Sequence, residues 1–203
     1  MKGLMLKDLY VISKQMKYIL LMIILFTILL GYTFGAFALI LCAMLPITTI
    51  GYDERAKWDK YAATMPYSRT EIVLSKYLLG LGCMLCAVVI VLIGMLGYAI
   101  FANTAFSMES VIYIVSVLSI ALIFMSLNLP IMFKWGVEKG RLIFIAGIAA
   151  FAAIIAATSA MENTANSIEA FMNSYYYAFV LAGIALLGAS IPLSISFYKK
   201  REL

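Results

Sequence analysis

The chain has 203 residues, of which 65% are hydrophobic, 15 are basic and 10 are acidic, giving a formal net charge of +5. This hydrophobic fraction far exceeds the roughly 45–50% of soluble domains, so it excludes a soluble fold and predicts an integral membrane protein. The basic balance is typical of cytoplasmic loops facing anionic lipid, and without a clustered basic face carrying a recognisable reader motif it does not indicate a nucleic-acid partner.

Charged residues divide the chain into short blocks separated by long apolar runs. The blocks are residues 1–17, 53–76, 134–141 and 199–203, and they hold all 15 basic residues. A membrane span needs about 20 apolar residues, so the runs 77–133 and 142–198 each accommodate two spans and an outer loop. The run 18–52 fits one long span or two short ones, but only two spans place every basic block on the cytoplasmic side.

We therefore predict an all-α polytopic membrane protein, a single transmembrane domain over residues 1–203, with six transmembrane helices and both termini in the cytoplasm. The predicted spans are residues 18–30, 36–52, 77–101, 111–133, 142–160 and 175–198. Pro46, Pro130 and Pro192 fall within spans, where a proline bends or locally opens a helix. Simple bends and a role in gating are both compatible with these positions.

Residues 1–17 have the pattern of an amphipathic helix lying in the membrane interface. Its predicted apolar face comprises Met5, Leu9, Ile12 and Met16. Its predicted polar face comprises Lys7, Tyr10, Lys14 and Lys17. The helix could contact a partner or serve only as an anchor.

Residues 53–76 hold nine of the 25 charged residues, five basic and four acidic. Apolar and aromatic residues at helical spacing predict a short amphipathic helix, with one face formed by Trp58, Tyr61, Ala62 and Met65. Pro66 interrupts it, and the capping box Ser68-Arg69-Thr70-Glu71 starts a new helix leading into the third span. This helix–turn–helix on the membrane surface could dock a partner through aromatic anchors or pack against its own chain.

Several kinds of chemistry are missing from the sequence. It contains no G-x-x-x-x-G-K-[ST] phosphate-binding loop, so it does not bind ATP in that way. It has no histidine, and the pair Cys83 and Cys86 lacks a second pair of ligands, so we predict no metal site. The predicted span centres carry no charge, which disfavours proton coupling, and no nucleophile–base pair indicates an enzyme.

The two longer cytoplasmic blocks resemble those of bacterial ATP-binding-cassette (ABC) exporter permeases of the second exporter class. The similarity is carried by Asp53-Glu54, Trp58-Asp59-Lys60-Tyr61, Met65-Pro66, Ser68-Arg69, Glu71-Ile72-Val73 and Ser75-Lys76-Tyr77, and by residues 133–141 (FKWGVEKGR). It extends over the whole chain, and the group it most resembles contains the phenol-soluble modulin exporter permeases of Gram-positive bacteria.

The resemblance implies a permease in the bacterial cell membrane, with two such chains, identical or paralogous, and two cytosolic ABC ATPase subunits that bind ATP and Mg²⁺. Amphipathic, membrane-active peptides would be the cargo, moved out through a lipid-embedded path. The implied ATPase-coupling residues are Asp53, Glu54, Arg55, Lys57, Trp58, Asp59, Lys60, Tyr61 and Met65. The implied second-loop residues are Lys134, Glu138, Lys139 and Arg141, and those of the N-terminal connecting helix are Lys7, Leu9, Lys14 and Lys17. The alternative function is a membrane immunity or structural protein that acts without transport.

Overall fold

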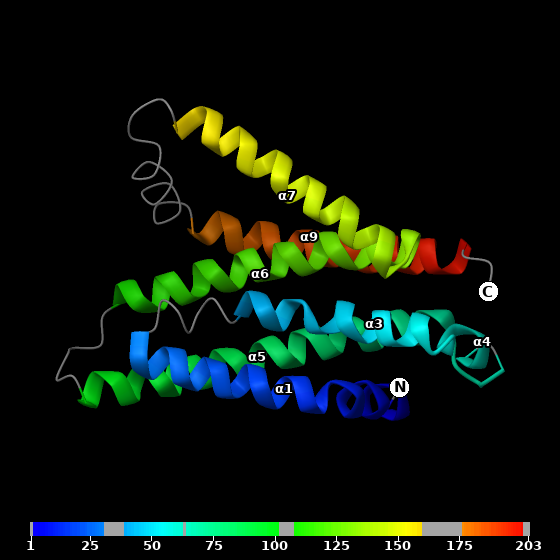
Figure 1. Cartoon of the computed structure of the whole chain (residues 1–203), viewed down its shortest axis with the longest axis horizontal. Coiled ribbons are helices and arrows are strands. Elements are labelled where there is room, and N and C mark those ends of the chain that lie inside the picture. The colour runs from blue at the N-terminus through cyan, green and yellow to red at the C-terminus, as the bar shows by residue number, and fades with distance from the viewer. Residues whose placement is uncertain (1, 31–38, 63, 102–107, 160–175, 201–203) are drawn as a thin grey trace.

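The computed structural model describes residues 2–30, 39–62, 64–101, 108–159 and 176–200. All regular structure in these residues is helical, which confirms the predicted all-α class. The helices are α1 (Lys2–Leu30), α3 (Leu45–Arg55), α4 (Trp58–Ala62), α5 (Arg69–Phe101), α6 (Met108–Trp135), α7 (Val137–Ser159) and α9 (Tyr176–Lys200). The long helices run roughly along one axis, except that α7 diverges from the rest (Figure 1).

Three of the described helices are long and apolar enough to cross a membrane. They are α5, α6 and α9, over Arg69–Gly97, Val111–Trp135 and Tyr177–Lys200. Within α1, the stretch Gln15–Leu25 is a shorter apolar helix. The membrane character of the chain is thus confirmed, while the count of six spans stays a prediction. The expected turn at 31–35, between the first two predicted spans, and much of both outer loops lie outside the described residues.

The helix α1 runs without interruption through the predicted interfacial segment and the predicted first span. The two segments are therefore parts of one helix. Its buried face also differs from the expected one, since Leu4, Asp8 and Ile12 are buried at every fourth position and Leu9 is exposed. Ile12 and Met16 of the predicted apolar face do pack in or against the core, but the prediction included the exposed Leu9 and left out Asp8, which lies at the centre of the packed side.

The next helical stretch is interrupted at Met44, and Pro46 lies in the first turn of α3. Proline is tolerated there because the first helical N–H groups have no partner within the helix. The helix α3 then continues to Arg55, beyond the predicted end of the span. It stops because Lys57 adopts a positive φ of 51°, and α4 begins at the following residue.

The capping box before the third predicted span is confirmed. The backbone N–H of Ser68 donates to Glu71 Oε2 at 2.9 Å, and the N–H of Glu71 donates to Ser68 Oγ at 3.2 Å. The preceding helix is shorter than expected, because α4 ends at Ala62 and Met65 lies in a turn. Pro66 lacks the N–H needed to continue a helix, so the predicted helical face does not extend to Met65.

The helices pack in two extensive pairs, α6 with α9 and α1 with α5, and α5 also contacts α9. A buried polar network crosses between them: the Tyr77 hydroxyl of α5 bonds to Ser190 and Ser194 of α9. Ser190 Oγ in turn donates to the backbone carbonyl of Ser126 in α6 at 2.6 Å. Hydroxyl groups that bond between helices are a common way of joining membrane helices.

Candidate functional site

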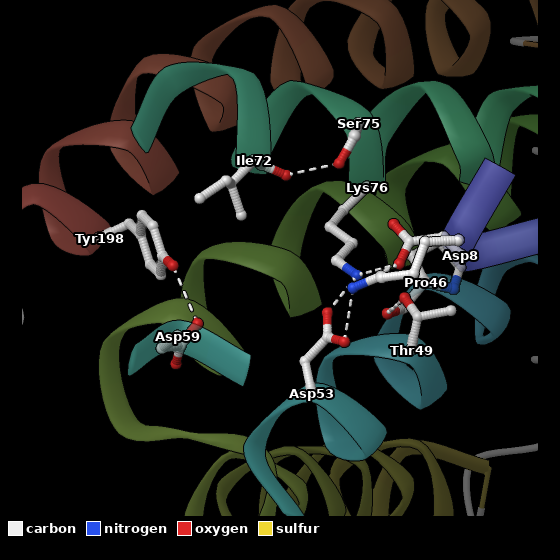
Figure 2. A network of polar contacts seen from close by, with 10 residues as sticks. Asp8, Pro46, Thr49, Asp53, Asp59, Ile72, Ser75, Lys76 and Tyr198 are labelled. Carbon is white, nitrogen blue, oxygen red and sulfur yellow. Dashed lines mark hydrogen bonds and ion pairs between the residues drawn. The ribbon is translucent and has the colours of Figure 1, made fainter. Parts of the chain in front are cut away.

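Four charged side chains form a cluster where α1, α3 and α5 meet, with Asp8, Asp53 and Lys76 buried and Lys7 partly exposed. The Nζ atom of Lys76 lies 2.7 Å from Asp8 Oδ1 and 2.6 Å from Asp53 Oδ2. Lys7 Nζ lies 2.7 Å from Asp53 Oδ1 and 3.1 Å from Asp8 Oδ1. The side chains of Lys76 and Asp53 point toward each other (Figure 2). We call these four residues the ion cluster; its two cations and two anions balance, as buried charge requires.

The ion cluster holds Asp53 inside the protein. Asp53 is only 9% exposed, and both of its carboxylate oxygens accept hydrogen bonds from lysines. In the part of the chain that the structure describes, no group of His, Cys, Asp or Glu side chains could hold a metal ion. Asp53, expected to be an ATPase-coupling residue, therefore supports residues 53–76 from within.

Glu54 bonds to the elbow between α6 and α7, residues 135–137. Its Oε2 accepts the backbone N–H of Val137, the first residue of α7, at 2.9 Å. Gly136 has a positive φ of 80°, and a Cβ atom at that position would lie 2.7 Å from Glu54 Oε1. A carboxylate at a helix N-terminus satisfies an otherwise unpaired N–H and complements the helix dipole. Glu54 thus caps α7 from a different helix.

Asp59 of α4 contacts the C-terminal end of α9. Its Oδ1 accepts a hydrogen bond from the Tyr198 hydroxyl at 2.9 Å (Figure 2). The Tyr198 ring packs edge-on against Phe133, with centroids 5.5 Å apart. Arg69, at the start of α5, donates to the backbone carbonyl of Lys199 at 2.7 Å. The last turn of α9 is therefore attached both to α4 and to the start of α5.

An open cleft of about 730 Å³ lies between the end of α3, α4 and the elbow. Two of the acids in its lining, Glu54 and Asp59, are the ones bonded to α7 and α9. Five exposed cations line it: Arg55, Lys57, Lys60, Lys139 and Arg141. The mixed charge of residues 53–76 is thus divided: most of the acids face inward and most of the cations face outward. The cleft is a basic surface suited to an anionic partner.

The aromatic residues expected to be anchors lie in different environments. Trp58 is half-buried against the core, and Lys7 Nζ lies 4.4 Å from its ring centroid. Tyr61 is 62% exposed and Met65 is 40% exposed. Only the latter two are open to a partner, while Trp58 ties α4 to α1.

The remaining expected site residues lie around the cleft or along α1. Glu138 is exposed on the cleft wall beside the two second-loop cations. Lys134 is exposed and lies 4.4 Å from the Trp135 ring centroid and 5.0 Å from that of Phe197. Of the connecting-helix residues, Lys7 belongs to the ion cluster and Lys17 is exposed. The side chain of Lys14 lies outside the described set.

Sequence reasoning did not identify Asp8, Lys76 or Tyr198 as residues of this site. Asp8 is the only acidic residue in the first 17, and it stands four positions from both Leu4 and Ile12. That spacing is a signal that it lies on the packed face. Lys76 could have been suspected because it is followed only by apolar sequence in α5. Tyr198 carried no comparable signal, because its partner lies 139 positions away.

Comparison with protein-family models matched residues 3–199 to the family described as ABC-2 family transporter protein. No curated protein and no solved structure matched the chain.

Proposed function

The chain belongs to the ABC-2 family of transporter proteins, and from this membership we propose that it is the permease of an ATP-driven exporter of amphipathic peptides. Family membership makes it a transmembrane permease component of an ABC transporter. Because the sequence has no phosphate-binding loop, the energy comes from separate ABC ATPase subunits that bind ATP and Mg²⁺. Two permease chains and two ATPase subunits form the complete exporter.

The observation that carries the ATPase-docking part of this proposal is the division of charge around the cleft. The acids Asp53, Glu54 and Asp59 bond to four different helices, α1, α5, α7 and α9. A segment anchored in this way transmits a displacement to those helices. Its exposed cations complement an acidic partner surface, which speeds encounter and fixes register. One ATPase subunit docks at the cleft of each permease chain, contacting Tyr61 and Met65 as well.

The proposed topology has six spans with both termini in the cytoplasm of a bacterial cell. The N-terminus, α4, the start of α7 and the C-terminal end of α9 lie at the same end of the bundle (Figure 1). Gathering the basic blocks at one end is in line with the cytoplasmic bias of Lys and Arg. The cleft then faces the cytosol, where the ATPase resides.

The cargo class follows from the resemblance in the two cytoplasmic blocks. Membrane-active, amphipathic peptides partition into the bilayer and can reach a path between apolar helices from within it. This part is tested with inside-out membrane vesicles that contain the complex, to which a fluorescent amphipathic peptide is added from outside. We expect ATP-dependent accumulation in the vesicle lumen, whereas accumulation without ATP, or none at all, would contradict peptide export.

The permease assignment is tested by co-expressing the chain with an ABC ATPase subunit encoded in the same operon and purifying the complex in detergent. We expect the two proteins to co-elute in equal numbers and the ATPase to hydrolyse ATP in the complex. A second arm abolishes hydrolysis in the ATPase: peptide movement should stop. If the membrane chain still protects cells from the peptide when no ATPase is present, that result would favour the immunity or structural alternative instead.

A further inference from the structure

Within the described residues, α7 is attached to the rest of the molecule mainly at one end. It contacts α6 and α3, and forms no comparable contact with α1, α5 or α9. The contacts lie near its start, and the helix diverges from α9 and α6 toward its other end (Figure 1). A rod held at one end changes its angle when that end is displaced. The position of α7 therefore depends on the residues around the elbow and on one ring contact two turns further along, where Phe144 packs edge-on against Phe124 of α6 with centroids 4.7 Å apart.

Close contacts at the elbow come from the last turns of α3. Besides the Glu54–Val137 hydrogen bond, Gly51 of α3 lies beside Val137, since an added Cβ atom would be in ordinary van der Waals contact with Val137 Cγ1 at 3.5 Å. On the other side of the elbow, a Cβ atom at Gly140 would lie 2.5 Å from Met132 Sδ of α6. The first turn of α7 thus packs between α3 and α6.

The chain offers no local replacement for the Glu54 contact. Residues at the start of a helix are usually capped by the preceding side chain, but the residue before Val137 is Gly136, which has none. Its positive φ is a backbone conformation that favours glycine, and it allows a sharp turn between α6 and α7. The carboxylate of Glu54 takes over the capping role from 83 positions away.

We propose that Glu54 is a positioning residue that sets the angle of α7 relative to the α6–α9 pair, with Gly136 as the pivot. Neighbouring Asp53 ties the same turn of α3 to α1 and α5 through the ion cluster. A displacement of α4 by the docked ATPase moves the end of α3, and Glu54 passes that movement to the first turn of α7. This role in coupling rests on the proposed function; the control of the α7 angle does not.

The first arm of the test measures the α7–α9 distance in the full-length permease alone, in lipid nanodiscs. Nitroxide labels replace the exposed Ile145 of α7 and Leu193 of α9, with the exposed Cys86 changed to Ser and labelled chain diluted with unlabelled chain. Double electron–electron resonance then compares variants of Glu54. We expect Glu54→Ala to broaden and lengthen the distance distribution, because α7 loses its cap and its link to α3.

Matched variants separate positioning from loss of a cap in general. Glu71→Ala removes an equivalent carboxylate-to-backbone bond, to Ser68 at 2.9 Å, but that bond lies within the start of α5; it should leave the distribution unchanged. Glu54→Gln keeps an acceptor oxygen and should restore most of the wild-type distribution. If Glu54→Ala does not fold, Glu54→Asp keeps the charge but shortens the side chain by one methylene, which withdraws the carboxylate from the Val137 N–H.

The second arm adds the ATPase and a non-hydrolysable ATP analogue. We expect the wild-type distance to shift on nucleotide binding and Glu54→Ala to lose that shift while still binding the ATPase. Equal distributions for wild type and Glu54→Ala in the first arm, or for wild type and Glu54→Asp where the alanine variant does not fold, would overturn the positioning role. An equal nucleotide-driven shift in wild type and Glu54→Ala would overturn transmission through Glu54. Failure of the wild-type chain to bind any ATPase would instead contradict the proposed function, leaving the first arm to decide the control of α7.

Discussion

Replacing Lys76 by Met should destabilise the protein strongly, because it removes a cation from the centre of the ion cluster. The side chains of Lys76 and Asp8 are 3% and 1% exposed, so water cannot take over the lost contacts. The variant leaves two buried aspartates with Lys7 as the only cation of the cluster. Breaking a buried ion pair by removing one partner costs about 3–5 kcal/mol. Lys7 lies within 3.1 Å of both aspartates and offsets part of this, so we expect about 3 kcal/mol.

For a chain of this size, about 3 kcal/mol corresponds to a fall in apparent Tm of roughly 6–12 °C, measured by scanning fluorimetry in detergent. Lys60→Met is the control, because an exposed lysine should change stability by less than about 0.5 kcal/mol. The double variant Lys76→Met/Asp8→Asn restores charge balance, and we expect it to regain about 1–3 kcal/mol. The reasoning fails if Lys76→Met matches Lys60→Met, or if the double variant is no more stable than Lys76→Met.

Two further substitutions test the packing between helices. Gly80→Ala should cost about 1–3 kcal/mol, because its Cβ would lie 2.7 Å from Pro46 Cγ; Gly82→Ala, which meets open space, should be neutral or stabilise by up to about 1 kcal/mol. Equal effects on apparent Tm would refute this close approach. Tyr77→Phe should cost about 0.6–1.7 kcal/mol by removing the hydroxyl bonded to Ser190, and a further Ser190→Ala should then cost less than it does in the wild-type chain.

The sequence was sufficient to predict what depends on local pattern. Long apolar runs between charged blocks predicted a helical membrane protein, and the spacing of Ser68 and Glu71 predicted the start of α5 correctly. These features could be recognised because their signals lie within one helical turn or one continuous run. The interruption near Pro46 could be expected for the same reason, since a proline acts on its own helix.

The direction in which the charged residues point could not be predicted in this way. Asp8 and Lys76 are 68 positions apart, and Glu54 and Val137 are 83 apart, so their pairing depends on tertiary packing. Apolar periodicity assigns charged residues to a solvated face, so the predicted apolar face of α1 included Leu9 and left out Asp8. It also treated the acids of residues 53–76 as part of a docking surface, whereas Asp53 anchors the segment from inside.

The central claim is that the basic cleft docks an ATPase, and the most direct test is the affinity of that complex under charge reversal. Lys57→Glu/Lys60→Glu reverses two exposed cations of the cleft, and Lys199→Glu/Lys200→Glu reverses two exposed cations outside its lining. Binding of the purified ATPase to each permease in nanodiscs is measured by biolayer interferometry at two salt concentrations. We expect the cleft variant to lose at least about tenfold in affinity, or about 1.4 kcal/mol, and the control to bind as the wild type does. Equal affinity of all three would contradict docking at the cleft.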